Sequence, residues 1–597
     1  MRKGLKVLAL IISMFTLSTC VKADEINVAK IGDKEYATLE EAIKVVDTNE
    51  KIELLGNAIL DIGRVDKEIT IVGNGYMVTV PTQTSTNNSD SRGRLIVNSK
   101  LTFEDTVVYF SNNYENGWSV VMGSDSDATG SELNFLNNSK VTFEDTGIYV
   151  GPRGVINVDN STVTLQNMKY TSIMGVITTR KDVDSYPVLN ISNGSVFTIK
   201  EQMDINGITN FHINVDKANL NITDCANQGL VASSLTLTNG AEADISRNST
   251  GFNMYSYNTI TVNDGTTLKM NDNTSRALMM QGKGNVLVKA GGTFEVLRNG
   301  SDWSKEDSEE LHYATKSAIT IGVYGYYEAW GYIYTKLGDQ VVFEDGALVD
   351  ISNNYVRGIS NFGDLRIGAT TKIMNNGGET VGQGGGIYNA GTTIINDGAK
   401  IYNNHAYIAG DDMFNESVRG NVSSRIDTPT IKIASVGEDW KLDGEPDCED
   451  RINGWYDDNS NNRWEAHGET LEDDYIEKVS EGEYRDELAI KAAHDKLMGI
   501  VVVRYLDSDG NELTDEIITT DIVGNKYVTE KKEFEGYTFI SVEGEVSGEY
   551  IDGTVYVTYY YDKNIGTGDI EPPQTGADFG RINTSQIEIV LYRKEEE

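Results

Sequence analysis

The chain has 597 residues and a formal net charge of −40, with 91 acidic residues against 51 basic ones. This length is too great for one compact hydrophobic core, so we expect several domains. The negative charge repels the phosphates of nucleic acids and of anionic lipids, which excludes both classes of partner and favours a well-solvated extracellular surface.

The first 23 residues are typical of a secretory signal peptide. Basic residues precede an apolar run at residues 7–17, which is too short to span a membrane. The small residues that follow predict cleavage between Ala23 and Asp24, so the mature chain is expected to carry no transmembrane segment. An alternative is a lipoprotein signal ending at Cys20, although Thr19 is a poor residue before a lipidated cysteine.

Residues 24–62 are predicted to form an N-terminal cap with one short amphipathic helix. Thr38 and Glu41 have the spacing of a capping box, in which each side chain satisfies a backbone N–H at the helix start. The apolar residues that follow repeat at helical spacing: Leu39, Ala42, Ile43 and Val46. A cap here would cover the unpaired backbone of the first coil of the next domain.

A repeated pattern over residues 63–433 predicts a β-solenoid. Its clearest copies lie at 340–404, where alternating apolar residues are followed by a glycine turn and then by two asparagines. Alternation with a period of two indicates strands with one buried face, and asparagines at equivalent turns can form a ladder from coil to coil. The turn glycines recur about every 20–30 residues, except for one interval of 54 that corresponds to about two units with an insertion, and this spacing predicts on the order of 15 coils: Gly240, Gly265, Gly292, Gly346, Gly368 and Gly398.

Parts of this stretch resemble known β-helical proteins. Residues 31–43 and 68–73 resemble the entry of pectate-lyase-like right-handed β-helix proteins of bacterial surfaces. Residues 384–389, Gly-Gly-Gly-Ile-Tyr-Asn, are similar to a phrase common in β-helical surface proteins. The resemblance implies an all-β, right-handed parallel β-helix. The alternative is a β-sandwich, whose short strands would not repeat one side-chain pattern at fixed spacing.

An aromatic segment interrupts the repeat between residues 299 and 337. Its rings are candidates for stacking on sugars, with the tyrosine hydroxyls as hydrogen-bonding groups. The candidate ligand-binding residues are Tyr326, Tyr327, Trp330 and Tyr332. The alternative is a pair of strands whose rings pack against the flank of the solenoid.

Residues 434–498 differ in character and are predicted to form a small capping or connecting module. Three tryptophans and an acidic run mark it, and residues 454–457 and 463–464 resemble segments that follow β-helices in clostridial-type adhesins. A disulfide between Cys225 and Cys448 is an open alternative to two incidental cysteines. We expect the fold not to depend on disulfides.

Residues 499–563 resemble the mucin-binding-protein (MucBP) domain over its whole length. The resemblance rests on residues 503–513 (Val-Arg-Tyr-Leu-Asp-Ser-Asp-Gly-Asn-Glu-Leu), 534–537 and 555–561. It implies a β-grasp-like module of surface adhesins, in which we take Tyr505 and Tyr537 as candidate ligand-binding residues.

The segment from Asp507 to Asn511 has oxygen-bearing side chains at alternate positions. It could mimic a calcium loop, but the rest of a calcium-binding loop does not fit the strand that follows. A plain turn without metal is therefore expected.

The tail, residues 564–597, contains Glu-Pro-Pro-Gln-Thr-Gly at 571–576, which resembles a Pro-Pro-x-Thr-Gly sorting motif. The resemblance implies sortase cleavage between Thr575 and Gly576 and attachment to peptidoglycan. Such signals continue into an apolar segment of about 20 residues, which the remaining residues do not supply. A truncated or decayed signal is therefore an open alternative.

These features favour a secreted or cell-surface adhesin that binds host or mucosal glycans or glycoproteins, with no cofactor, metal or catalytic residue. The alternative is a β-helical polysaccharide lyase or glycoside hydrolase, for which Asp411 and Asp412 are the candidate carboxylates. The five histidines are scattered without zinc-binding spacing. A third possibility is a spacer that only holds the distal module away from the cell.

Overall fold

The computed structural model describes the following parts of the chain: residues 27–81, 95–111, 118–123, 127–168, 171–175, 182–202, 206–255, 257–302, 316–322, 326–328, 331–333, 338–378, 381–416, 428–437, 440, 452, 454–461, 478–493, 498–523, 525–551 and 553–564. The chain divides into two compact units, Met1–Leu497 and Met498–Glu597. Each unit is described by itself below.

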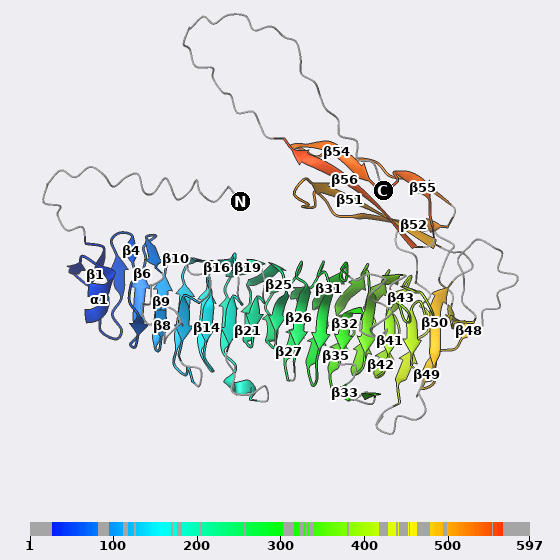
Figure 1. Cartoon of the computed structure of the whole chain (residues 1–597), viewed down its shortest axis with the longest axis horizontal. Helices are drawn as coiled ribbons and strands as arrows, with labels where there is room; N and C mark the ends of the chain where they lie inside the picture. Colours follow the sequence, from blue (N-terminus) through cyan, green and yellow to red (C-terminus); the bar gives the residue numbers. More distant parts are fainter. Residues whose placement is uncertain are drawn as a thin grey trace, which may run out of the picture. The chain divides into compact units, whose positions relative to one another are not determined.

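The first unit is a β-solenoid in which each coil adds one strand to each of three sheets (Figure 1). Strands of successive coils pair in parallel, so that side chains one coil apart lie directly over each other. The second sheet has 13 strands among the described residues, one for each coil. The prediction of a parallel β-solenoid from the repeated strand-and-turn pattern is confirmed, and the β-sandwich alternative is wrong.

The first sheet begins with two antiparallel pairings and is then parallel up to its last strand. Its 17 strands are β1 (Ala29–Ile31), β2 (Lys34–Tyr36), β3 (Ile52–Leu54), β6 (Ile69–Val72), β9 (Lys100–Glu104), β12 (Glu132–Leu136), β15 (Val155–Asp159), β18 (Val188–Ser192), β21 (His212–Asp216), β24 (Ser234–Thr238), β27 (Thr259–Val262), β30 (Asn285–Val288), β35 (Gln340–Phe343), β38 (Asp364–Ile367), β42 (Thr392–Ile395), β46 (Thr430–Ile433) and β49 (Gly482–Tyr484).

The second sheet is parallel throughout its described strands. It contains β4 (Ala58–Ile59), β7 (Met77–Val80), β10 (Val107–Ser111), β13 (Lys140–Glu144), β16 (Thr162–Gln166), β19 (Val196–Gln202), β22 (Asn219–Cys225), β25 (Glu242–Asp244), β28 (Thr267–Lys269), β31 (Thr293–Leu297), β36 (Leu348–Ser352), β39 (Lys372–Met374) and β43 (Lys400–Tyr402).

The third sheet ends in three strands from the segment after the solenoid, which pair antiparallel. Its 16 strands are β5 (Arg64–Val65), β8 (Leu95–Val97), β11 (Val120–Met122), β14 (Ile148–Val150), β17 (Ile173–Gly175), β20 (Ile208–Thr209), β23 (Gln228–Val231), β26 (Thr250–Met254), β29 (Arg276–Met280), β32 (Ser317–Ile321), β37 (Arg357–Asn361), β41 (Ile387–Asn389), β45 (Met413–Asn415), β50 (Leu488–Ala493), β47 (Gly454–Asp457) and β48 (Lys478–Val479).

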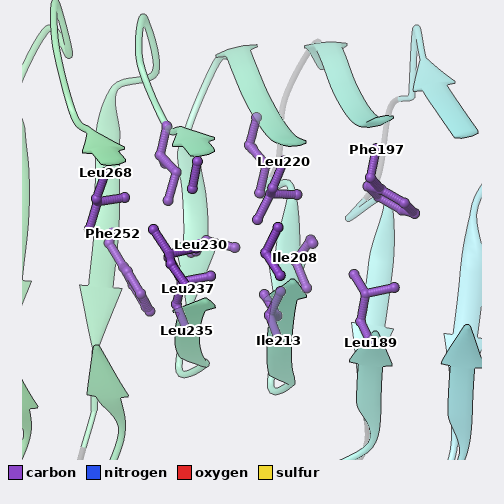
Figure 2. Packing of buried hydrophobic residues seen from close by; sticks show 14 of the residues in the cluster. Leu189, Phe197, Ile208, Ile213, Leu220, Leu230, Leu235, Leu237, Phe252 and Leu268 are labelled. Carbon is purple, nitrogen blue, oxygen red and sulfur yellow. The ribbon is translucent and has the colours of Figure 1, made fainter. Parts of the chain in front are cut away.

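The core is a continuous column of apolar side chains enclosed by the three sheets. Figure 2 shows leucine, isoleucine and phenylalanine side chains of successive coils pointing inward between the strands. The strand register places similar side chains of successive coils over each other. Phe110 pairs with Phe143, and their rings stack with centroids 4.2 Å apart. One coil cannot bury these residues by itself, so stacking supplies the apolar burial that stabilises the fold.

Both ends of the solenoid are covered. At the N-terminus, helix α1 (Leu39–Val45) buries Leu39, Ala42 and Ile43, and the Thr38 hydroxyl accepts the Glu41 N–H at 3.2 Å. At the other end, β49 and β50 pair antiparallel with the last coil. The Trp440 and Trp455 rings pack edge-to-face with centroids 5.3 Å apart.

Smaller elements lie between the main strands. They are the 3₁₀ turn η2 (Val183–Ser185), the antiparallel pair β33 (Tyr326–Glu328) and β34 (Gly331–Ile333), and the parallel pair β40 (Gly377–Gly378) and β44 (His405–Ala406).

The second unit is a four-stranded sheet with a small two-stranded layer. The sheet order is β52 (Ile517–Ile522), β51 (Met498–Asp507), β56 (Gly553–Lys563) and β54 (Tyr537–Glu543), in which the two central strands are parallel. The second layer pairs β53 (Lys526–Val528) with β55 (Ser547–Glu549) antiparallel.

Candidate functional site

The inner face of the second unit's main sheet is a core of stacked tyrosines. Tyr505 is only 2% exposed, and its ring stacks on Tyr559 with centroids 5.4 Å apart. Its hydroxyl donates to the Glu530 carbonyl at 2.8 Å. Tyr537 is half-buried and packs against the same cluster. The structure thus places Tyr505 in the core, and any contact of either ring with a ligand stays a prediction.

The opposite face of this sheet carries a different set of side chains. Because side chains alternate along a strand, Arg504 and Tyr556 point away from the tyrosine core. The Arg504 guanidinium carbon lies 4.7 Å from the centroid of the Tyr556 ring, and Arg504 Nε donates to Glu516 Oε1 at 2.6 Å. This geometry combines a cation–π contact with a charge-assisted hydrogen bond.

A second tyrosine, Tyr560, lies further along β56 than Tyr556 and on the same face of the sheet. The Tyr560 hydroxyl donates to Glu543 Oε2 at 2.8 Å, and this hydrogen bond raises the pKa of Tyr560 above its usual range. We call Arg504, Glu516, Glu543, Tyr556 and Tyr560 the Arg504 patch. Sequence reasoning missed it, although alternation along residues 555–561 separates Tyr556 and Tyr560 from the core tyrosines.

The Asp507 turn satisfies its own polar groups. Asp507 Oδ1 accepts the backbone N–H groups of Asp509 at 3.0 Å and of Asn511 at 2.8 Å. Donation from the Asn511 side chain to the same carboxylate is the main reason that the pKa of Asp507 lies below its usual range. Across the described part of the chain, no group of three or more His, Cys, Asp or Glu residues is arranged to hold a metal ion.

The aromatic segment of the solenoid is described only as backbone. Strands β33 and β34 pair Tyr326 with Ile333 and Tyr327 with Tyr332. Trp330 lies outside the described residues. The sugar-stacking role of these residues therefore stays a prediction.

Asp411 and Asp412, the carboxylates of the enzyme alternative, lie at the end of a buried asparagine ladder. Asp412 Oδ1 accepts both the backbone N–H and the side-chain amide of Asn404, at 3.0 and 2.8 Å. Its Oδ2 accepts the Ala492 N–H of the antiparallel strand β50 at 2.7 Å. Asp412 therefore joins the last coil to the capping strand.

Asp411 makes a similar connection. Its Oδ2 lies 2.8 Å from Lys491 Nζ, and its Oδ1 accepts the Ala406 N–H at 2.9 Å. Both carboxyl groups are buried, and burial raises the pKa of Asp412 to about 7. The arrangement attaches the cap and does not present two carboxylates to a bound sugar.

Several predicted residues lie outside the described parts of the chain: Ala23 and Asp24 of the signal peptide, Thr575 and Gly576 of the sorting motif, and Cys448. Cys225 is a free, buried cysteine, and burial raises the pKa of its thiol to about 12. Among the described residues, no helix is long and apolar enough to cross a membrane.

Comparison with known proteins identifies the C-terminal unit. Residues 500–562 match the MucBP domain family. Over 67 residues the chain is 37% identical to internalin J of Listeria monocytogenes serovar 1/2a strain EGD-e and 33% identical to internalin J of serotype 4b strain F2365. The match covers 11% of this chain but only 8% and 7% of the two relatives. The likeness therefore concerns the MucBP domain and leaves the solenoid aside.

Proposed function

We propose that this protein is a secreted or cell-surface adhesin whose MucBP domain binds glycans or glycoproteins of host or mucosal surfaces. The observation that carries the proposal is the family match over residues 500–562, on a unit that is compact by itself. The solenoid serves as a support, and the protein performs no catalysis. Individual contacts are weak, and many copies on one cell raise the overall affinity through multivalency.

A mucin-binding measurement tests this proposal. The purified chain is added to immobilised mucin before and after enzymatic removal of the mucin glycans, with the heat-unfolded chain as the control. We expect saturable binding that is lost after glycan removal. Absence of binding both to mucin and to a broad glycan array would contradict the proposal.

We further propose that the chain is exported by cleavage between Ala23 and Asp24 and joined to peptidoglycan after sortase cleavage between Thr575 and Gly576. The sequence patterns at the two ends support this route. Fractionation of producing cells tests it, because attached protein remains with the wall. The Thr575→Ala variant should move the protein into the medium, and an unchanged distribution would show that the motif is inactive.

A further inference from the structure

The Arg504 patch has the layout of a small sugar-binding platform. Register places Arg504 and Glu543 on either side of Thr558, so that a row of charged side chains crosses the sheet. Tyr556 and Tyr560 precede and follow Thr558 by two residues on the same strand. At 3.4 Å per residue their Cα atoms are about 14 Å apart, which suits a short oligosaccharide with one ring at each end.

The groups in the patch match the chemistry of sugars. A tyrosine ring stacks on the apolar C–H face of a sugar, while carboxylates accept hydrogen bonds from its hydroxyl groups. Both tyrosines are half-buried and Glu543 is exposed, so the rings are held in place and still reach solvent. The existing contacts, Arg504 with Glu516 and Tyr560 with Glu543, orient these side chains before any ligand arrives.

Charge decides which sugars fit. Arg504 is matched by Glu516 at 2.6 Å, and Glu543 adds a further negative charge. The whole chain carries −40. A sialylated or sulfated glycan would therefore be repelled, whereas uncharged sugars are not.

We propose that the outer face of the four-stranded sheet binds a short oligosaccharide of uncharged hexose or N-acetylhexosamine units, with Tyr556 and Tyr560 as stacking rings and Arg504, Glu516 and Glu543 as polar contacts. This inference rests on the proposed glycan-binding function and names the face and the ligand class.

The test uses the full chain and an array of uncharged, sialylated and sulfated oligosaccharides, followed by titration with the best uncharged ligand. We expect Tyr556→Ala and Tyr560→Ala each to weaken binding about tenfold, the loss of one stacked ring. Tyr560→Phe keeps the ring and loses the hydroxyl, so it should bind more tightly than Tyr560→Ala. Val528→Ser, at a side chain 73% exposed on β53, is the matched control and should bind normally.

The outcomes separate this inference from the proposed function. Thermal unfolding of each variant shows whether it is folded, and Tyr560→Phe serves if an alanine variant is not. If Tyr556→Ala and Tyr560→Ala both bind the glycan as tightly as the wild type, the outer face of the sheet is not the binding site, but the adhesin proposal still holds. Binding only to sialylated or sulfated glycans overturns the ligand class. A wild-type chain that binds no glycan overturns both proposals.

Discussion

Each turn between the second and third sheets in the later coils uses two residues with different tasks. The first has a positive φ, as at Asn353 (φ 57°) and Asn375 (φ 55°), which asparagine tolerates better than most residues. The second turns inward and joins a buried ladder. Its members are Asn248, Asn273, Asn299, Asn354, Asn376 and Asn404. The paired asparagines of the sequence thus encode the turn and the ladder separately.

We predict that the second asparagine of each pair, which joins the ladder, contributes far more to the stability of the solenoid than the first. Asn376 Oδ1 accepts the Asn354 N–H and side-chain amide, and its Nδ2 donates to the Ile351 carbonyl at 2.7 Å. Asn376→Ala removes the acceptor of the buried Asn354 N–H and the donor to the Ile351 carbonyl, while the Asn354 amide keeps its bond to the Val296 carbonyl. The cost is about 1–3 kcal/mol for each buried group left unpaired. Asn375→Gly keeps the positive φ and should change stability little. Hydrogen exchange of the amides in neighbouring coils measures the loss of local stability in each variant. Equal losses in Asn376→Ala and Asn375→Gly would contradict a stabilising role of the ladder.

The last acceptor of the ladder is an aspartate for a definable reason. The capping strand presents the Ala492 N–H group, so the side-chain atom that faces it must be an oxygen, and an asparagine amide nitrogen there would set a donor against a donor. Burial raises the pKa of Asp412 to about 7 from 3.8. Between these values the folded state holds a proton that the unfolded chain has released. The group's contribution to stability is therefore full below pH 3.8 and falls as pH rises to 7.

A comparison of the wild type with Asp412→Asn tests whether the stability contributed by Asp412 falls as the pH rises. We expect the variant to be less stable at the last coil, because the Ala492 N–H, one of three donors to Asp412, loses its acceptor. The difference in stability between the wild type and the variant should shrink as the pH is raised from 3.8 to about 7, because the asparagine of the variant does not titrate. Hydrogen exchange of the last-coil amides over that range is the measurement. An advantage that grows with pH would show that the ionised form is the favoured one.

At the scale of elements, glycines at the start of third-sheet strands make room for the ladder, Gly358 within β37 and Gly386 just before β41. A Cβ atom on Gly358 would lie 2.7 Å from the Gly386 carbonyl oxygen and 3.1 Å from Asn376 Nδ2. A Cβ on Gly386 would lie 2.8 Å from Asn404 Nδ2. These strands therefore approach the neighbouring turn more closely than a side chain allows.

Gly358→Ala should push two coils apart and destabilise the solenoid by about 1–3 kcal/mol, the usual cost of overpacking. Gly265→Asn is the control, since Gly265 has φ +68° with no atom within 4 Å of its Cβ position, and asparagine tolerates that backbone. Thermal unfolding of both variants decides the matter. Similar melting temperatures for Gly358→Ala and the wild type would contradict a close approach here.

Sequence reasoning predicted the elements that leave a repeating pattern within one continuous stretch of the chain. Alternation indicated strands with one buried face, the repeat indicated their parallel stacking into coils, and the paired asparagines indicated the ladder. The role of Asp412 could not be predicted, because it depends on Ala492, which lies 80 residues away in the sequence. The Arg504 patch was missed for a related reason, since it joins residues of β51, β54 and β56 with Glu516, the residue before β52, and no single stretch of sequence reveals the register that brings them together.

At the scale of the whole molecule, the net charge of −40 governs how the proposed adhesin meets a mucin. Sialylated and sulfated mucins are themselves anionic, so the long-range electrostatic force between the two is repulsive. Salt screens this force over a Debye length of about 8 Å at physiological ionic strength. Short-range stacking and hydrogen bonds to uncharged sugars are affected far less.

Binding to native mucin should therefore strengthen as salt is raised from low to physiological concentration. This is the opposite of the behaviour of a basic adhesin, whose attraction to mucin is screened by salt. Mucin freed of sialic acid and sulfate is the matched control, because little repulsion remains and binding should depend only weakly on salt. Association rates measured on both surfaces test the argument. Binding to native mucin that weakens with added salt would point to a local basic contact strong enough to overcome the charge of the chain.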